Sequence, residues 1–136
     1  MADWVRLLIP SEAGARSIRA PLPQALVARL LGAAKSVSRP PGRPGVEPRF
    51  SVYVVLLDFG ARDWRLYVGM TGVTPEERYL NHKAGYKASK WVNKHGIGLL
   101  PALYKRVNPL DWEPAMEVEV ALAGALRSAG VRVIQG

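Results

Sequence analysis

Glu119 is the residue whose type fits its surroundings least well. The positions three, four and seven residues away are all apolar: Ala115, Met116, Leu122, Ala123 and Leu126. On a helix these residues share one face, so Glu119 lies in the middle of a predicted buried stripe, whereas Glu117 falls on a more polar face. A buried carboxylate is costly unless it is paired, hydrogen-bonded or bound to a metal. Two interpretations stay open, a metal ligand or a carboxylate paired with an arginine at the edge of the core.

Arg78 and His82 form a second group, one helical turn apart, so that both project from one face of a predicted helix. The amino terminus of that helix offers free backbone N–H groups and partial positive charge, which favour a bound phosphate. Taken alone, the pair is more often two surface residues. Tyr53 and Tyr67 add two phenols on predicted strands, where tyrosines are usually packing residues with a satisfied hydroxyl.

A predicted β-hairpin positions the two tyrosines. Residues 50–59 are rich in β-branched and aromatic side chains, which is typical of a buried strand. Residues 60–63 supply a turn, and residues 65–70 make a second strand. The two strands are expected to pair in antiparallel fashion.

Helices are predicted to carry the arginine, the histidine and the glutamate. Thr74, Pro75 and Glu77 indicate a helix start with a capping box, and Gly85 indicates its end. Further elements are predicted along the chain: helices over residues 87–94 and 114–127, an edge strand over 97–100 that stops at Pro101, and a terminal strand over 131–134.

The first 48 residues read differently from the rest. Residues 4–9 form a short apolar run, and residues 23–34 have helical spacing. The run over residues 38–45 is too rich in proline and glycine for a helix or a central strand. The sequence therefore divides into an N-terminal extension, residues 1–48, and a domain over residues 49–136.

Composition narrows the class of protein. With 136 residues the chain suits one ordinary domain, and the lack of cysteine excludes disulfides, zinc ribbons and thiol nucleophiles. No apolar run approaches the length of a membrane span, and Asp3 stands where a signal peptide carries positive charge, so we expect a cytoplasmic protein with no membrane partner. The net charge of +8 favours polyanionic partners.

The positive charge is concentrated in one stretch. No acidic residue lies between Glu77 and Asp111, where basic residues alternate with Tyr79, Tyr86, Trp91 and Tyr104. Basic side chains neutralise phosphates and aromatic rings stack on unpaired bases. The same pattern is equally consistent with aromatic core residues beside a solvated lysine face.

Taken in order, these residues resemble the GIY-YIG nuclease superfamily. That family joins two tyrosine-bearing strands to an arginine in the next helix and a glutamate in a later helix. Here the two motifs read Ser51-Val52-Tyr53 and Tyr67-Val68-Gly69. Serine replaces the glycine of the first motif, and valine replaces both isoleucines. The resemblance covers residues 50–134.

The resemblance implies an α+β fold, with a small antiparallel three-stranded sheet flanked by helices, and a metal-dependent endonuclease. Glu119 would hold one Mg²⁺ or Mn²⁺, and Arg78 would stabilise the charge of the transition state. Tyr53 or Tyr67 would position or deprotonate the attacking water, with a pKa lowered by nearby cations. His82 would act as an auxiliary proton donor or phosphate contact.

Nucleic acid, and DNA in the first instance, is the expected substrate. Gly69 would let the backbone approach the cleft, and four lysines would carry the nucleic-acid backbone: Lys83, Lys87, Lys90 and Lys94. A non-catalytic nucleic-acid-binding module is the alternative, and a protein-interaction domain with a basic surface is a third. A carboxylate facing a polyanion does not help binding, so Glu119 argues against a pure binder. Substrate structure and oligomeric state are left open.

Overall fold

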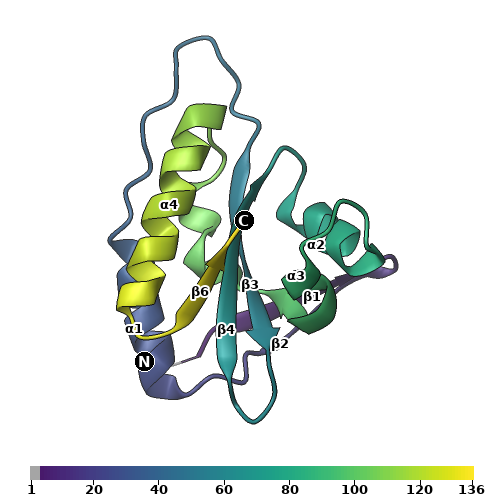
Figure 1. Cartoon of the computed structure of the whole chain (residues 1–136). Coiled ribbons are helices and arrows are strands. Elements are labelled where there is room, and N and C mark those ends of the chain that lie inside the picture. Colours follow the sequence, from purple (N-terminus) through teal and green to yellow (C-terminus); the bar gives the residue numbers. More distant parts are fainter. Residues whose placement is uncertain (1–3) are drawn as a thin grey trace.

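A six-stranded mixed sheet forms the centre of the protein (Figure 1). The computed structural model describes residues 4–136. The strands lie in the order β2-β1-β5-β3-β4-β6. Their bounds are β1 (Arg6–Ser11), β2 (Gly14–Arg19), β3 (Ser51–Asp58), β4 (Trp64–Thr71), β5 (Gly96–Leu99) and β6 (Arg132–Gln135). Neighbouring strands are antiparallel except β4 and β6, which are parallel.

Helices cover both faces of the sheet. The helices are α1 (Gln24–Lys35), α2 (Pro75–Ala84), α3 (Lys90–His95) and α4 (Trp112–Ser128), with short 3-10 turns at Pro101–Leu103 and Lys105–Val107. In Figure 1, α1 and α4 lie on one side of the sheet, and α2 and α3 lie on the other. Strand β3 is therefore buried on both faces, and Val52 to Leu57 are at most 1% exposed.

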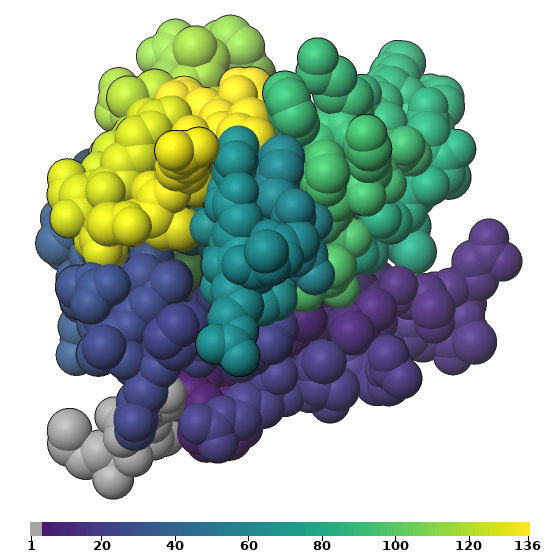
Figure 2. Space-filling view, turned by 60° about the horizontal axis from the view of Figure 1, so that its bottom comes forward, coloured from purple at the N-terminus to yellow at the C-terminus, as the bar shows by residue number. Residues whose placement is uncertain are grey.

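The prediction of a small antiparallel three-stranded sheet is wrong. The hairpin β3–β4 and the strand β5 are present, but three further strands join them. Residues 6–19 fold as a hairpin whose first strand pairs with β5, and β6 pairs with β4. The N-terminal segment thus contributes to the same sheet and core, where Leu7, Val27 and Leu30 are each 1% exposed. The β1–β2 hairpin projects from the rest of the surface (Figure 2).

Strand β5 lies inside the sheet rather than at its edge. A Cβ atom at Gly98 would lie only 2.8 Å from the carbonyl oxygen of Leu8 on β1. Because glycine has no Cβ, β1 can approach β5 closely. Pro101 comes two residues after Leu99, the last residue of β5, and begins a 3-10 turn, so its missing N–H does not interrupt the ladder.

The predicted N-cap and C-cap residues of α2, Thr74 and Gly85, are confirmed. The Thr74 hydroxyl accepts a hydrogen bond from the backbone N–H of Glu77 at 3.1 Å. Gly85 ends the helix in the left-handed conformation, with φ of +83°, which favours glycine. This capped helix places Arg78 and His82.

Within residues 4–136, no helix is both long enough and apolar enough to cross a bilayer.

Candidate active site

A hydrogen bond joins Tyr53 of β3 directly to His82 of α2. The Tyr53 hydroxyl oxygen lies 2.7 Å from His82 Nε2, and the two residues are 1% and 0% exposed. The backbone N–H of Ser89 donates to His82 Nδ1 at 2.9 Å, so Nδ1 carries no proton. A neutral ring then carries its proton on Nε2 and donates it to Tyr53. Burial, helped by the charge of Arg78, lowers the pKa of His82 from 6.5 to about 4, so the ring is neutral at pH 7.

Tyr53 lies beside Tyr67 of β4. The two ring centroids are 6.1 Å apart. Burial raises the pKa of both tyrosines, and their mutual interaction further raises the pKa of Tyr53 but lowers that of Tyr67. Because the Tyr53 oxygen accepts from His82, its own O–H is free to donate. Tyr67 is therefore the phenol next to the end of the series from Ser89 through His82 to Tyr53.

The expectation that nearby cations give the two tyrosines a lowered pKa is wrong. The charge of Arg78 does lower the pKa of each, but desolvation by burial has the larger effect and the net shift is upward. Both side chains are therefore neutral phenols at pH 7. Of the two, Tyr67 is the more exposed, at 7%.

Gly69 makes room for both tyrosine rings. It lies opposite Tyr53 in the β3–β4 register. A Cβ atom at Gly69 would be 2.8 Å from the Tyr53 hydroxyl oxygen and 3.0 Å from a ring carbon of Tyr67. Any larger residue would push the rings away from the strand. The close approach predicted for Gly69 thus serves the tyrosines themselves.

Arg78 lies beside these rings, since its charge lowers the pKa of Tyr53, Tyr67 and His82. Its guanidinium donates to the carbonyl oxygen of Lys87 at 2.7 Å and to that of Tyr86 at 3.4 Å. These bonds hold the loop between α2 and α3. Within residues 4–136, Arg78 has no carboxylate partner, so its charge is available to an anion.

Glu119 of α4 is 7% exposed, in agreement with its predicted place on a buried stripe. The side-chain amide of Gln135 donates to Glu119 Oε1 at 3.1 Å. Burial raises the pKa of Glu119, and the bond from Gln135 offsets part of that rise. The alternative of an arginine partner is wrong, because no lysine or arginine of the described chain forms an ion pair with Glu119. The carboxylate also raises the pKa of Tyr67, so it lies within electrostatic reach of the tyrosine.

Glu119 is the candidate ligand for a divalent cation. Residues 4–136 contain no group of three or more histidine, aspartate or glutamate side chains that could hold a metal ion. Mg²⁺ commonly keeps several waters and takes only one or two carboxylates from the protein. Glu119 offers one buried carboxylate, which accepts a hydrogen bond from Gln135 and forms no ion pair with a lysine or arginine of the described chain. The residues present therefore suit a water-rich site with Glu119 as its protein ligand.

The four lysines predicted to bind nucleic acid differ in their surroundings. The Lys83 ammonium donates to the carbonyl oxygens of Asn93 and Gly96, each at 3.0 Å. These bonds tie α2 to the end of α3, which favours a structural role for Lys83. All four lysines are exposed, but within residues 4–136 the structure gives Lys87, Lys90 and Lys94 no such bonds to carbonyl oxygens. The aromatic residues of the same stretch also divide, because Tyr79 and Tyr104 are buried whereas Tyr86 is 60% exposed.

Two residues of the site were missed in the sequence. Ser89 caps α3 with its hydroxyl, which accepts from the N–H groups of Trp91 and Val92, and a hydrogen bond from it lowers the pKa of Tyr67. A serine before a short helix is a cap signal that could have identified it. Gln135 carried no such signal, because its position depends on the pairing of β6 with β4.

Comparison with known proteins adds no identification. No protein-family model matches the sequence, and no curated protein or solved structure is significantly similar to it. The resemblance to the GIY-YIG superfamily rests on the residues alone and stays a prediction.

Proposed function

We propose that the protein is a metal-dependent endonuclease of the GIY-YIG type that hydrolyses phosphodiester bonds, with DNA as the expected substrate. The hydrogen bond between the buried side chains of His82 and Tyr53, with the Tyr67 ring beside both, is the observation that supports this most strongly. The Tyr67 hydroxyl experiences the opposite charges of Arg78 and Glu119. A base, a cation for phosphate and a carboxylate for metal are the groups that phosphodiester hydrolysis requires.

In this proposal Tyr67 contacts the attacking water. A phenolate at Tyr67 would be stabilised by the hydrogen bond from Tyr53 and by the charge of Arg78. For this step Tyr67 would first lose its own proton to solvent; as the water oxygen then bonds to phosphorus, the water proton would pass to the Tyr67 phenolate and the bond to the leaving oxygen would break. Tyr53 stays a phenol that donates to Tyr67, and neutral His82 orients Tyr53.

Arg78 and Glu119 act on the phosphate. The Arg78 guanidinium would donate to phosphate oxygens, whose negative charge grows in the transition state. Glu119 would hold the metal ion, which when bound polarises a phosphate oxygen and stabilises the leaving oxyanion. The three exposed lysines after α2 would contact neighbouring phosphates.

Nicking of supercoiled plasmid in Mg²⁺, Mn²⁺ or EDTA tests the proposal, with Glu119→Gln and Glu117→Gln as a matched pair on α4. Glu117 is exposed, whereas Glu119 is buried. We expect metal-dependent nicking that falls about a hundredfold or more in Glu119→Gln, because a charge that acts in the transition state is lost. Glu117→Gln should nick like the wild type. Circular dichroism and thermal melting show whether both variants fold.

A non-catalytic nucleic-acid-binding module is the second candidate, and the raised pKa of both tyrosines favours it, since neutral phenols are poor bases. The same assay separates the two functions. Absence of nicking by folded wild-type protein, together with salt-sensitive DNA binding that does not depend on metal, would support the binding module and contradict hydrolysis.

A further inference from the structure

A cluster of three aromatic rings lies outside the proposed active site, where the β3–β4 turn meets α3. We call Phe59, Trp91 and His95 the ring cluster. The Phe59 and His95 rings are stacked, with centroids 3.9 Å apart and planes at 15°. The Trp91 centroid is 5.9 Å from that of Phe59 and 6.4 Å from that of His95. These distances place Trp91 beside the stacked pair rather than on top of it.

Cations border the ring cluster. The Arg65 guanidinium lies 4.0 Å from the Phe59 centroid, on the face that His95 leaves open. The Lys90 ammonium lies 4.8 Å from the Trp91 centroid. Lys90 and Lys94 are exposed, and in the described part of the chain neither forms an ion pair. Their ammonium groups are therefore free to contact phosphates.

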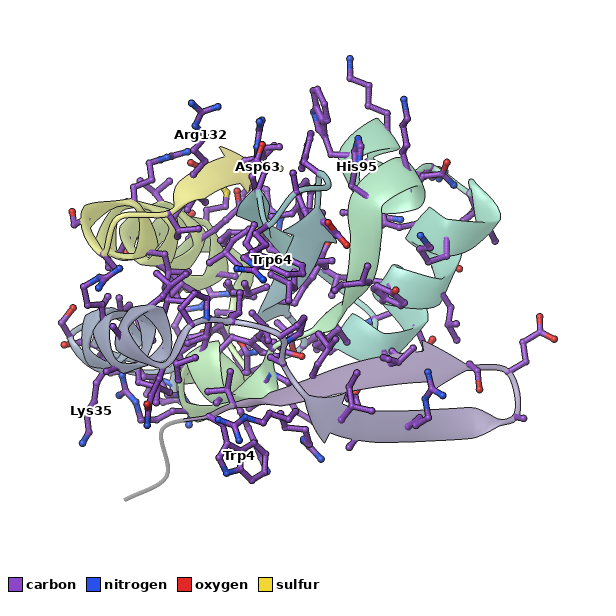
Figure 3. The ribbon with its side chains drawn as sticks, turned by 90° about the horizontal axis from the view of Figure 1, so that it is seen from below. Trp4, Lys35, Asp63, Trp64, His95 and Arg132 are labelled. Carbon is purple, nitrogen blue, oxygen red and sulfur yellow. The ribbon has the colours of Figure 1, made fainter. Side chains whose placement is uncertain are left out.

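Acidic residues do not cancel this charge. Asp63 forms an ion pair with Arg65 at 2.8 Å and also feels the charge of Arg132. Asp58 is the other acid on the β3–β4 turn, where Arg62 is also exposed. Figure 3 shows Arg132, Asp63 and His95 along the same side of the molecule. This side carries more cations than acids, which suits a polyanion.

The ring cluster is close to the proposed active site along β4. Arg65 and Tyr67 are two residues apart, so their side chains leave the same face of the sheet with about 7 Å between their Cα atoms. Figure 2 shows the β3–β4 turn at the surface between α3 and the C-terminal residues. A nucleic-acid strand whose phosphate reaches Tyr67 therefore has a neighbouring nucleotide within reach of the ring cluster.

We infer that the ring cluster receives an unpaired nucleobase, so that the substrate has a single-stranded segment beside the cleaved bond. The base stacks on Trp91 once the flexible Lys90 side chain moves to a phosphate, and its edge then lies beside the His95 ring or the Arg65 guanidinium. Every base has a π-face, so this stacking is open to any sequence. A base within a duplex is already stacked and paired, and cannot enter. The position of the cleaved bond rests on the proposed function, whereas the base binding does not.

Fluorescence anisotropy without metal tests the inference, because binding is measured in the absence of cleavage. The probes are a labelled oligo-dT, an oligo-rU, an abasic oligonucleotide of equal length and charge, and a duplex. We expect the wild type to bind the better of oligo-dT and oligo-rU about tenfold or more tightly than the abasic strand. That preference should disappear in Trp91→Leu, with the affinity for the abasic strand unchanged. Trp112→Leu, which removes a 54% exposed tryptophan of α4, should retain the preference.

Equal affinity of the wild type for base-bearing and abasic strands overturns the inference, as does a preference that survives in folded Trp91→Leu. Should Trp91→Leu not fold, ultraviolet crosslinking of a bromouracil oligonucleotide to the intact protein replaces it. Crosslinks at Trp91 or His95 support the inference, and crosslinks found only elsewhere contradict it. Base preference without nicking would support base binding by the ring cluster and contradict the proposed hydrolase. Nicking without base preference would support the hydrolase and contradict base binding by the ring cluster.

Discussion

His82 is held as a neutral ring by a contact at each nitrogen, and this makes the fold sensitive to acid. Its pKa is about 4 in the folded protein against an ordinary 6.5, so between these values the unfolded chain binds a proton that the folded protein does not. Stability is fully present above the unfolded pKa and falls as pH drops towards 4, by up to about 3 kcal/mol from this residue. Urea unfolding from neutral pH to about pH 4 measures the loss.

The control for this prediction is the same series on His82→Gln. Glu119 has a raised pKa, so its contribution has the opposite sign, because the folded protein favours its protonated form. Subtracting one unfolding series from the other cancels the contribution of Glu119, because both proteins contain this residue. If His82→Gln loses as much stability towards acid as the wild type, His82 is not the group that titrates.

Substitutions of Tyr53 and Tyr67 should differ in their effects on stability and on nicking. Tyr53→Phe leaves the buried His82 Nε2–H without an acceptor, which should lower the free energy of unfolding by about 1–3 kcal/mol. Tyr67→Phe removes only the last hydroxyl of the series, so it should cost less stability but abolish nicking if Tyr67 is the base. Thermal melts and nicking rates of the two folded variants test this. If Tyr67→Phe nicks normally and Tyr53→Phe is folded but inactive, Tyr53 is the base instead of Tyr67.

The residues of the candidate site could be named from the sequence, but their protonation and hydrogen bonding could not. Glu119 was recognised because a helical stripe can be counted, and the structure places it in that stripe. The pKa of the tyrosines depends on burial from several elements at once, which no local pattern records. The contact between Gln135 and Glu119 could not be predicted for the same reason, since it spans sixteen positions and depends on a strand pairing.

At the scale of elements, β5 should be intolerant of any side chain at Gly98. Gly98→Ala would place a methyl group 2.8 Å from the Leu8 carbonyl oxygen and 2.9 Å from the Leu7 side chain. The backbone of β1 would have to move, and overpacking of this kind costs about 1–3 kcal/mol. Urea unfolding measures the change.

Gly124→Ala is the matched control. Gly124 lies in α4, and a Cβ atom there would meet nothing within 4 Å. Alanine favours a helix over glycine, so this variant should gain about 0.5–1 kcal/mol. Equal effects of the two substitutions would contradict the close approach of β1 to β5.

Elements made by neighbouring residues could be predicted, and those made by distant pairing could not. The caps of α2 and the β3–β4 hairpin follow from a few adjacent residues, and both are present. The pairing of β1 with β5 joins Leu8 to Leu99, far beyond any local pattern. Strand β2 is exposed at all six positions, so it lacks the alternation of apolar and polar residues that marks a half-buried strand.

For the whole molecule, the net charge of +8 predicts DNA binding that weakens steeply with salt. Each exposed lysine that neutralises a phosphate contributes about one unit to the slope of log affinity against log salt. Neutralising Lys87, Lys90 or Lys94 to glutamine should reduce the slope by about that amount, measured by anisotropy over a salt series. Lys83→Gln is the control and should leave the slope unchanged, since its ammonium is bound to carbonyl oxygens. An equal reduction in Lys83→Gln would mean that Lys83 also contacts DNA.

The sheet ends in two strands that each have only one neighbour, β2 and β6. A free strand edge is a template on which further copies can assemble, and proteins commonly prevent this with charged side chains. Strand β2 carries Arg16 and Arg19, both exposed, on a molecule that is already strongly positive. Two copies that approached along β2 would therefore bring like charges together. The hairpin that widens the sheet thus also protects it from edge-to-edge aggregation.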